Sequence, residues 1–160
     1  MTVTIRPARS GDAPVILRFI KELADYEREP DAVVTTEAML DDALFGATPK
    51  AEALIAESGG APIGFALFFH TYSTWTGRQG IWLEDLYVTP DARGSGAGKA
   101  LLAQLAGICL DRDCARFEWA VLDWNEPAIG FYRSIGALPM DDWTTQRVTG
   151  TALVKLAGRG

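Results

Sequence analysis

The stretch of sequence best suited to chemistry is a run of small and basic residues behind an apolar segment. This run consists of Arg93, Gly94, Ser95, Gly96, Ala97, Gly98 and Lys99. Glycines in such a turn let backbone N–H groups approach phosphate oxygens closely, and the start of a following helix adds a partial positive charge. Apolar residues then recur at helical spacing over residues 100–109. The segment therefore indicates a pyrophosphate site, with a glycine turn that binds no ligand as the simpler alternative.

Spacing separates this turn from two other phosphate-binding loops. A Walker loop ending at Lys99 requires glycine in place of Arg93 and serine or threonine in place of Ala100. A dinucleotide fingerprint starting at Gly94 requires glycine or alanine in place of Lys99. Both are excluded, and the pattern Arg93-x-x-Gly96-x-Gly98 remains.

Two carboxylates interrupt the strand-like residues 81–88 just before this turn. Glu84 and Asp85 stand among Ile, Trp, Leu, Tyr and Val side chains. An ionised carboxylate among apolar side chains costs several kcal/mol unless it has partners, so a role in packing alone is disfavoured. In a regular strand the two side chains point to opposite faces, and only one of them is expected to reach a shared cleft. A strand edge that faces solvent is the alternative.

A second polar segment lies at residues 123–137. Asn125 can cap a helix whose first turn contains Pro127, and the helix would carry Ala128, Phe131 and Tyr132. Phe131 can pack inward while Tyr132 points elsewhere, and a half-buried aromatic residue without a chemical role is the simpler interpretation of Tyr132.

The pattern Arg93-x-x-Gly96-x-Gly98 and the run Asn125-x-x-Ala128-x-x-Phe131-Tyr132 resemble, in the same order, two signatures of GNAT acetyltransferases. Similarity to the diamine branch, which includes spermidine/spermine and thialysine N-acetyltransferases, extends over the whole chain. It includes residues 5–8, 20–27, 83–88 and 124–127. The resemblance implies a single GNAT domain over residues 1–160 and a mixed α/β fold, with a mostly antiparallel sheet and helices on both faces.

The resemblance also implies an activity and site residues. Acetyl-CoA would be the co-substrate, Glu84 the general base, Tyr132 the acid that protonates the departing thiolate, and the Val88 N–H an oxyanion donor. The implied cofactor-binding residues are Leu86, Tyr87, Val88, Arg93, Gly94, Ser95, Gly96, Ala97, Gly98, Lys99, Asn125, Ala128 and Tyr132. The implied substrate-binding residues are Tyr26, Glu27, Glu84, Glu118, Trp119, Ala120 and Asp142, with Asp141 as an alternative to Asp142.

The charged residues of the chain limit the classes of molecule that it can bind. Fifteen Lys and Arg residues against 21 Asp and Glu residues give a formal net charge of −6. Such a chain repels nucleic acid and anionic membranes and attracts a cationic amine. Cys109, Cys114 and His70 show no metal or redox spacing, so no metal is expected. We expect a cytoplasmic homodimer, and another amine substrate or a CoA-binding module without turnover stays as an alternative.

The chemistry requires particular elements around it. The pattern predicts a first strand at residues 3–5, helices along residues 15–23 and 35–46, and a hairpin around residues 58–62. It also predicts a strand at residues 117–122 that splays from the strand ending at Val88, a helix at residues 127–134 and a last strand at residues 152–156.

Overall fold

The computed structural model describes all 160 residues, which group into two compact units. The first unit is Met1–Leu122 and the second is Asp123–Gly160. Each is described by itself below, and the single domain over residues 1–160 stays a prediction. No helix in the chain is both long enough and apolar enough to span a bilayer.

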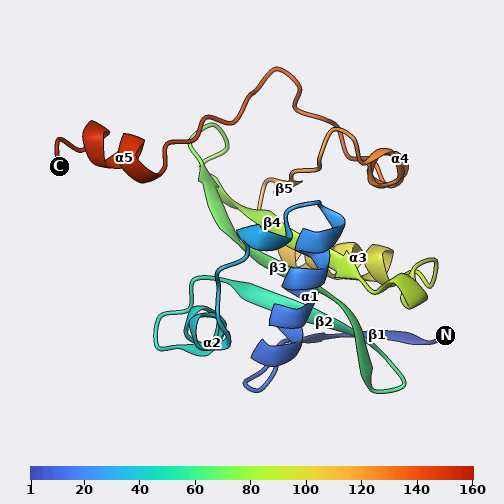
Figure 1. Ribbon diagram of the computed structural model, residues 1–160. Helices are drawn as coiled ribbons and strands as arrows, with labels where there is room; N and C mark the ends of the chain where they lie inside the picture. Colours follow the sequence, from blue (N-terminus) through green and yellow to red (C-terminus); the bar gives the residue numbers. More distant parts are fainter. The chain divides into compact units, whose positions relative to one another are not determined.

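The first unit is built on a five-stranded sheet with the order β1-β2-β3-β4-β5 (Figure 1). Its strands are Val3–Pro7, Glu52–Ser58, Ala61–Ser73, Arg78–Val88 and Phe117–Trp119. Neighbours are antiparallel from β1 to β4, and only β5 runs parallel to β4. The predicted mixed, mostly antiparallel sheet is confirmed.

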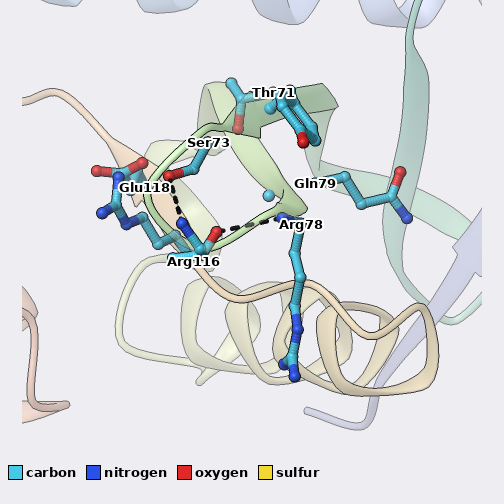
Figure 2. A pocket seen from close by; sticks show the side chains of 9 residues that line it. Thr71, Ser73, Arg78, Gln79, Arg116 and Glu118 are labelled. Atoms are coloured by element: carbon cyan, nitrogen blue, oxygen red, sulfur yellow. Dashed lines mark hydrogen bonds between the residues drawn. The ribbon is translucent and has the colours of Figure 1, made fainter.

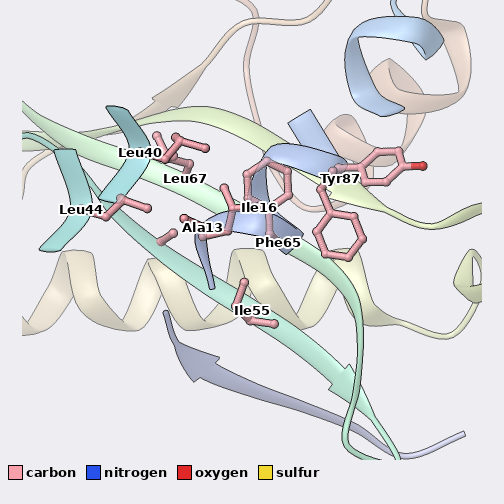
Figure 3. Packing of buried hydrophobic residues seen from close by; sticks show 10 residues of the cluster. Ala13, Ile16, Leu40, Leu44, Ile55, Phe65, Leu67 and Tyr87 are labelled. Atoms are coloured by element: carbon pink, nitrogen blue, oxygen red, sulfur yellow. The ribbon is translucent and has the colours of Figure 1, made fainter. Parts of the chain in front are cut away.

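Helices cover both faces of this sheet (Figure 1). The helices are α1 at Ala13–Tyr26, α2 at Glu37–Phe45 and α3 at Ala97–Asp111, with short 3₁₀ turns at Pro30–Ala32 and Pro90–Ala92. Figure 3 shows Ile16, Leu40, Ile55, Phe65 and Tyr87 in one buried cluster, so α1 and α2 lie on the same face. Because side chains alternate along a strand, the residues between them face the other way, where α3 contacts β1 to β4.

A β-bulge interrupts the pairing of β3 with β4 at the two carboxylates. Leu67 is paired with Asp85 and the next residue, Phe68, is paired with Leu83, so Glu84 is the extra residue. Asp85 is paired with Leu67 and lies two residues before Tyr87, so these three side chains are on the face covered by α1. The regular strand geometry expected from the sequence is interrupted at Glu84, because a bulge has no local signature in the sequence. That only one of the two carboxylates reaches a shared cleft stays a prediction.

Strand β5 separates from β4 soon after it starts. Only Ile81, Trp82 and Leu83 pair with it, opposite Phe117, Glu118 and Trp119. The strand expected at residues 117–122 is therefore regular only over its first three residues. The predicted divergence from the end of β4 is confirmed.

The second unit contains helix α4, at Glu126–Ser134, and helix α5, at Gly150–Leu156. The Asn125 side chain accepts the Ala128 N–H at 3.4 Å, as predicted for a cap. The strand predicted at residues 152–156 is wrong, since these residues belong to α5. They pair with no strand, and exposed Ala, Leu and Lys side chains favour a helix that satisfies its own backbone hydrogen bonds.

One glycine is required by packing at the end of β4. A Cβ atom at Gly64 would lie 2.5 Å from the Tyr87 carbonyl oxygen and 3.2 Å from the Val88 Cα. We expect Gly64→Ala to lower the free energy of unfolding by about 1–3 kcal/mol, because β3 and β4 would have to move apart. Urea unfolding measures this. Gly107→Ala, in open space on α3, is the control and should be neutral or stabilise by about 0.5–1 kcal/mol.

Candidate active site

The glycine turn has the geometry of an anion cradle. Gly94 and Gly96 have φ angles of +82° and +88°, a conformation that favours glycine. Gly96 is the N-cap of α3 and offers no side chain to the first turn, where the Ser95 hydroxyl accepts the Ala97 N–H at 3.3 Å. The amides of Gly98 and Lys99 belong to the first helical turn, whose N–H groups have no partner within the helix. The turn can therefore donate to phosphate oxygens.

Gly98 has no packing reason to be glycine. A Cβ atom there would meet only the Val88 Cγ2, at an ordinary contact of 3.9 Å, and its φ angle is not positive. At Gly64, by contrast, the neighbouring backbone leaves no room for a side chain. Open space above Gly98 fits a group that must come close to the backbone, as a pyrophosphate does.

The end of β4 presents its backbone to the side from which β5 has separated. The Thr89 N–H donates to the Ile63 carbonyl at 2.8 Å. Antiparallel pairs alternate, so the adjacent pair of Val88 with Gly64 exchanges no such bonds. The Val88 N–H and C=O therefore point away from β3, and the carbonyl accepts from the Arg93 Nε at 3.3 Å. The Val88 N–H can serve as an oxyanion donor at this open edge.

Arg93 joins the glycine turn to the end of α1. Its guanidinium lies over the Tyr26 ring, 5.1 Å from the ring centroid, while its Nε donates to Val88. A cation over an aromatic face is attracted by the ring quadrupole. This contact brings Tyr26, expected on the substrate side, to the strand end expected on the cofactor side.

Three carboxylates gather beside this strand end. The pKa of Asp85 is raised from 3.8 to about 6, mainly by burial and also by the negative charges of Glu84 and Glu27. Burial also raises the pKa of Glu27. Asp85 and Glu27 are half-buried, whereas Glu84 is exposed. The cluster suits a cation, and Asp85 titrates close to the pH at which a general base works best.

Two residues expected around the pantetheine arm face different ways. Tyr87 is buried against Phe19, and its hydroxyl donates to the Glu22 carboxylate at 2.8 Å. Burial and this bond raise the pKa of Tyr87 to about 12. Only the Tyr87 backbone can therefore contribute to a cofactor site. Leu86, on the opposite face, stays half-buried and can line one.

Glu118 lies on β5, and its role in substrate binding stays a prediction. It is paired with Trp82, and it lines a cavity of about 90 Å³ at the far end of β4 from Val88 (Figure 2). Thr71, Tyr72, Ser73, Thr76, Arg78, Gln79, Gly80 and Arg116 complete the lining. Trp119 is the last paired residue, and Ala120 follows it on the surface. Glu118 and Trp119 belong to β5, which starts beside the other end of β4, and spacing alone does not reveal this.

The second unit holds the remaining predicted residues. Asn125 and Ala128 form the start of α4, and Tyr132 lies on its last turns with its ring 5.6 Å from that of Phe131. Asp142 is exposed in the segment before α5, beside a turn in which the Trp143 N–H donates to Met140 at 3.2 Å. Their roles stay predictions.

The sequence pointed to Glu84, and the burial of Asp85 beside Glu27 was not visible in it. Both residues were visible as charges in an apolar strand, but only the bulge shows that Asp85 is the half-buried member beside Glu27. The contact between Arg93 and Tyr26 was also missed. It joins residues 67 positions apart (93 minus 26), and no local pattern reports it.

The chain is similar to several known proteins. Residues 17–137 match the acetyltransferase (GNAT) family. The chain is 40% identical to the thialysine N-epsilon-acetyltransferase of Sus scrofa, over 99% of each protein. It is 39% identical to spermidine/spermine N(1)-acetyltransferase-like protein 1 of Homo sapiens, over 96% of this chain and 23% of that protein. The solved structure of an integron cassette protein from the mobile metagenome of V. cholerae has a TM-score of 0.81 at 28% identity, over 98% of both chains.

These matches extend over most of the chain and include both the glycine turn and the carboxylate strand. The predicted fold and the predicted branch are confirmed. GNAT acetyltransferases use acetyl-CoA as the acetyl donor, which fits the open turn at Gly98. The chain therefore belongs to the GNAT family of acetyltransferases, in its diamine acetyltransferase branch, and is an acetyl-CoA-dependent N-acetyltransferase.

Proposed function

We propose that this enzyme acetylates a primary amine of a small cationic substrate, of the polyamine, diamine or lysine-analogue class. The observation that carries the proposal is the cluster of Glu27, Glu84 and Asp85 beside the open end of β4. Two carboxylates on β4 and one just after α1 attract a cation toward the strand end where the thioester would lie. The names of the relatives, a thialysine N-epsilon-acetyltransferase and a spermidine/spermine N(1)-acetyltransferase-like protein, support the same class.

The donor half of the site would hold acetyl-CoA along the turn and the separated strands. Pyrophosphate would bind the backbone of residues 93–99, with charge from Lys99, and the pantetheine arm would pass Leu86 and Val88 where β5 has left β4. Arg93 is engaged with Tyr26 and Val88, so its contribution is to fix the turn against α1.

The acceptor half would remove a proton before the amine attacks. A primary alkylammonium has a pKa near 10.4, so only about one molecule in a thousand is a free amine near neutral pH. We propose that the Glu84–Asp85 pair takes this proton, directly or through water. Asp85, with a pKa of about 6, is the member suited to hold it.

Direct attack in a ternary complex would then complete the transfer. The amine nitrogen forms a bond to the thioester carbon, the oxyanion is stabilised by the Val88 N–H, and the C–S bond breaks to release CoA thiolate. We propose that the Tyr132 hydroxyl protonates this thiolate, with Asn125 and Ala128 holding the start of its helix.

A substrate panel tests the proposal. The enzyme would be given acetyl-CoA with thialysine, spermidine, an aminoglycoside or a peptide with a free N-terminus, and free CoA thiol would be followed. We expect kcat/KM for thialysine or spermidine to exceed that for the other two by at least about tenfold. Faster turnover of the aminoglycoside or the peptide would contradict the substrate class, while leaving the acetyltransferase itself in place.

The glycine turn gives a test of the cofactor site. Gly98→Ala should weaken acetyl-CoA binding by about tenfold or more, about 1.4 kcal/mol, because the added methyl occupies the space expected for pyrophosphate. Calorimetry measures the Kd. Gly107→Ala makes the same change in the same helix, also in open space, and should leave the Kd unchanged. Equal affinities in the two variants would exclude pyrophosphate at this turn.

We also propose that the enzyme is a cytoplasmic homodimer. The side chains of Trp75 and Trp143 are 80% and 72% exposed, which is compatible with a contact surface. Cys109 and Cys114 are both free thiols, as is usual in a reducing compartment.

A further inference from the structure

The C-terminus of α3 ends in a backbone motif that brings its two cysteines together. The Asp113 N–H donates to the Leu110 carbonyl at 3.2 Å, and the Cys114 N–H donates to the Cys109 carbonyl at 2.8 Å. Asp113 between them has a φ angle of +56°. These are the two bonds and the left-handed residue of a Schellman motif. In this motif the side chain that follows the left-handed residue packs against a side chain in the last helical turn. Here these two residues are Cys114 and Cys109.

Contacts of the sulfur atoms agree with this placement. The Cys109 Sγ lies 3.7 Å from the carbonyl oxygens of both Cys114 and Arg116. Burial raises the pKa of the Cys109 thiol to about 11, and the charge of Cys114 and a hydrogen bond to its side chain contribute. The two thiols are therefore neighbours, although their spacing in the sequence resembles no redox motif.

The surroundings of the two sulfur atoms differ. Cys109 is buried, whereas Cys114 is partly exposed at the end of the helix. The His70 Nδ1 lies 4.0 Å from the Cys114 Sγ and 3.0 Å from the Gly80 carbonyl oxygen. Because a carbonyl only accepts, Nδ1 carries the hydrogen and presents an N–H near the sulfur.

Arg112 completes this environment. It donates to the His70 Nε2 at 2.9 Å, which holds the same neutral imidazole tautomer, and it binds both Glu52 oxygens at 2.6 and 2.8 Å. Hydrogen bonding to Glu52 raises the pKa of Arg112, with a smaller contribution from Cys114. The Cys114 sulfur therefore lies near an imidazole N–H and close to a guanidinium.

We propose that Cys109 and Cys114 form a reversible thiol–disulfide site, in which Cys114 reacts with peroxide and Cys109 resolves the product. The Cys114 sulfur attacks one peroxide oxygen, the O–O bond breaks, and sulfenic acid and water result. The Cys109 sulfur then attacks the Cys114 sulfur, the S–O bond breaks, and the hydroxide leaves with the Cys109 thiol proton as a second water. Overall, two thiols and hydrogen peroxide give one disulfide and two waters.

The backbone turn favours the resolving step. The Schellman motif already holds the two residues at a separation set by one backbone bond, as a short disulfide loop requires.

The test is to oxidise the full chain with hydrogen peroxide and map the thiols by alkylation and peptide mass spectrometry. We expect both thiols to be lost together, an intramolecular Cys109–Cys114 crosslink, and full recovery with dithiothreitol. Crosslinks only between two chains, or two thiols that both stay open to alkylation, would overturn the proposal.

Two variants separate the roles of the cysteines. In Cys114→Ser, the buried Cys109 should stay reduced at the same peroxide dose. In Cys109→Ser, Cys114 should stop at sulfenic acid, which dimedone traps. Loss of the Cys109 thiol at the wild-type rate in Cys114→Ser would overturn the order proposed. The wild-type crosslink decides the proposal even where a variant folds poorly, because it needs no substitution.

Discussion

Tyr132→Phe should lower kcat by roughly 10²–10⁴-fold while the KM for the amine and the Kd for acetyl-CoA stay nearly unchanged. The substitution keeps the ring beside Phe131 and removes only the hydroxyl that we propose as the acid for the CoA thiolate. A bond made mainly in the transition state affects kcat and kcat/KM alike. Steady-state kinetics, under conditions in which chemistry limits the rate, measure the effect.

Tyr72→Phe is the matched control for this change. Tyr72 lies near the end of β3, with its side chain 70% exposed, away from the carboxylate cluster and the glycine turn. Its loss of a hydroxyl should leave kcat unchanged. Equal kcat in Tyr132→Phe and the parent enzyme would return Tyr132 to the role of an aromatic without chemistry, and the carboxylate pair would be the only proposed catalytic group.

Asp85→Asn should give an enzyme that is more stable at high pH and far less active. Asn has nearly the same shape but never ionises, so it cannot accept the proton of the amine, and kcat should fall by roughly 10²–10⁴-fold. The parent enzyme should show an acidic limb in its activity profile near the Asp85 pKa of about 6. The variant should lack this limb.

The effect on stability has a defined sign. The folded state raises the pKa of Asp85 from 3.8 to about 6, so it favours the protonated carboxyl. That contribution is fully present below pH 3.8 and is lost as the pH rises through about 6. Relative to the parent, Asp85→Asn should therefore gain about 1–3 kcal/mol in free energy of unfolding between pH 4 and pH 8. Urea titrations at the two pH values measure the difference.

Glu84→Gln separates the two carboxylates. It removes a charge that raises the Asp85 pKa, so the acidic limb of the activity profile should move to lower pH while turnover persists. If Glu84→Gln instead abolished turnover and Asp85→Asn retained it, Glu84 would be the base, as the sequence alone had indicated.

The order of elements could be predicted because its signals are local. The apolar stripe of α1, the capping residues Thr36 and Asn125, and the turn between β2 and β3 each depend on neighbours in the chain. The glycine turn could also be predicted, since Gly96 and Gly98 stand at a fixed spacing. Strand β5 and helix α5 were harder to predict, because whether an apolar run pairs as a strand depends on partners that are distant in the sequence.

The chemistry of the candidate site could be predicted only in part for the same reason. The carboxylates were visible, but the bulge at Glu84 is set by the pairing of β3 with β4, and the raised pKa of Asp85 depends on burial beside Glu27. Likewise, the neighbouring thiols of Cys109 and Cys114 follow from the left-handed turn at Asp113, a position where glycine would have been the expected signal.

The most direct test of the central claim is to identify both products of one reaction. The enzyme would be incubated with acetyl-CoA and thialysine or spermidine, and mass spectrometry would quantify the acetylated amine while a thiol reagent quantifies free CoA. We predict one N-acetylated amine for each CoA released, and no CoA release when the amine is omitted. CoA release without an acetylated amine, or no release with any amine, would contradict the assignment of acetyl transfer to a small cationic amine.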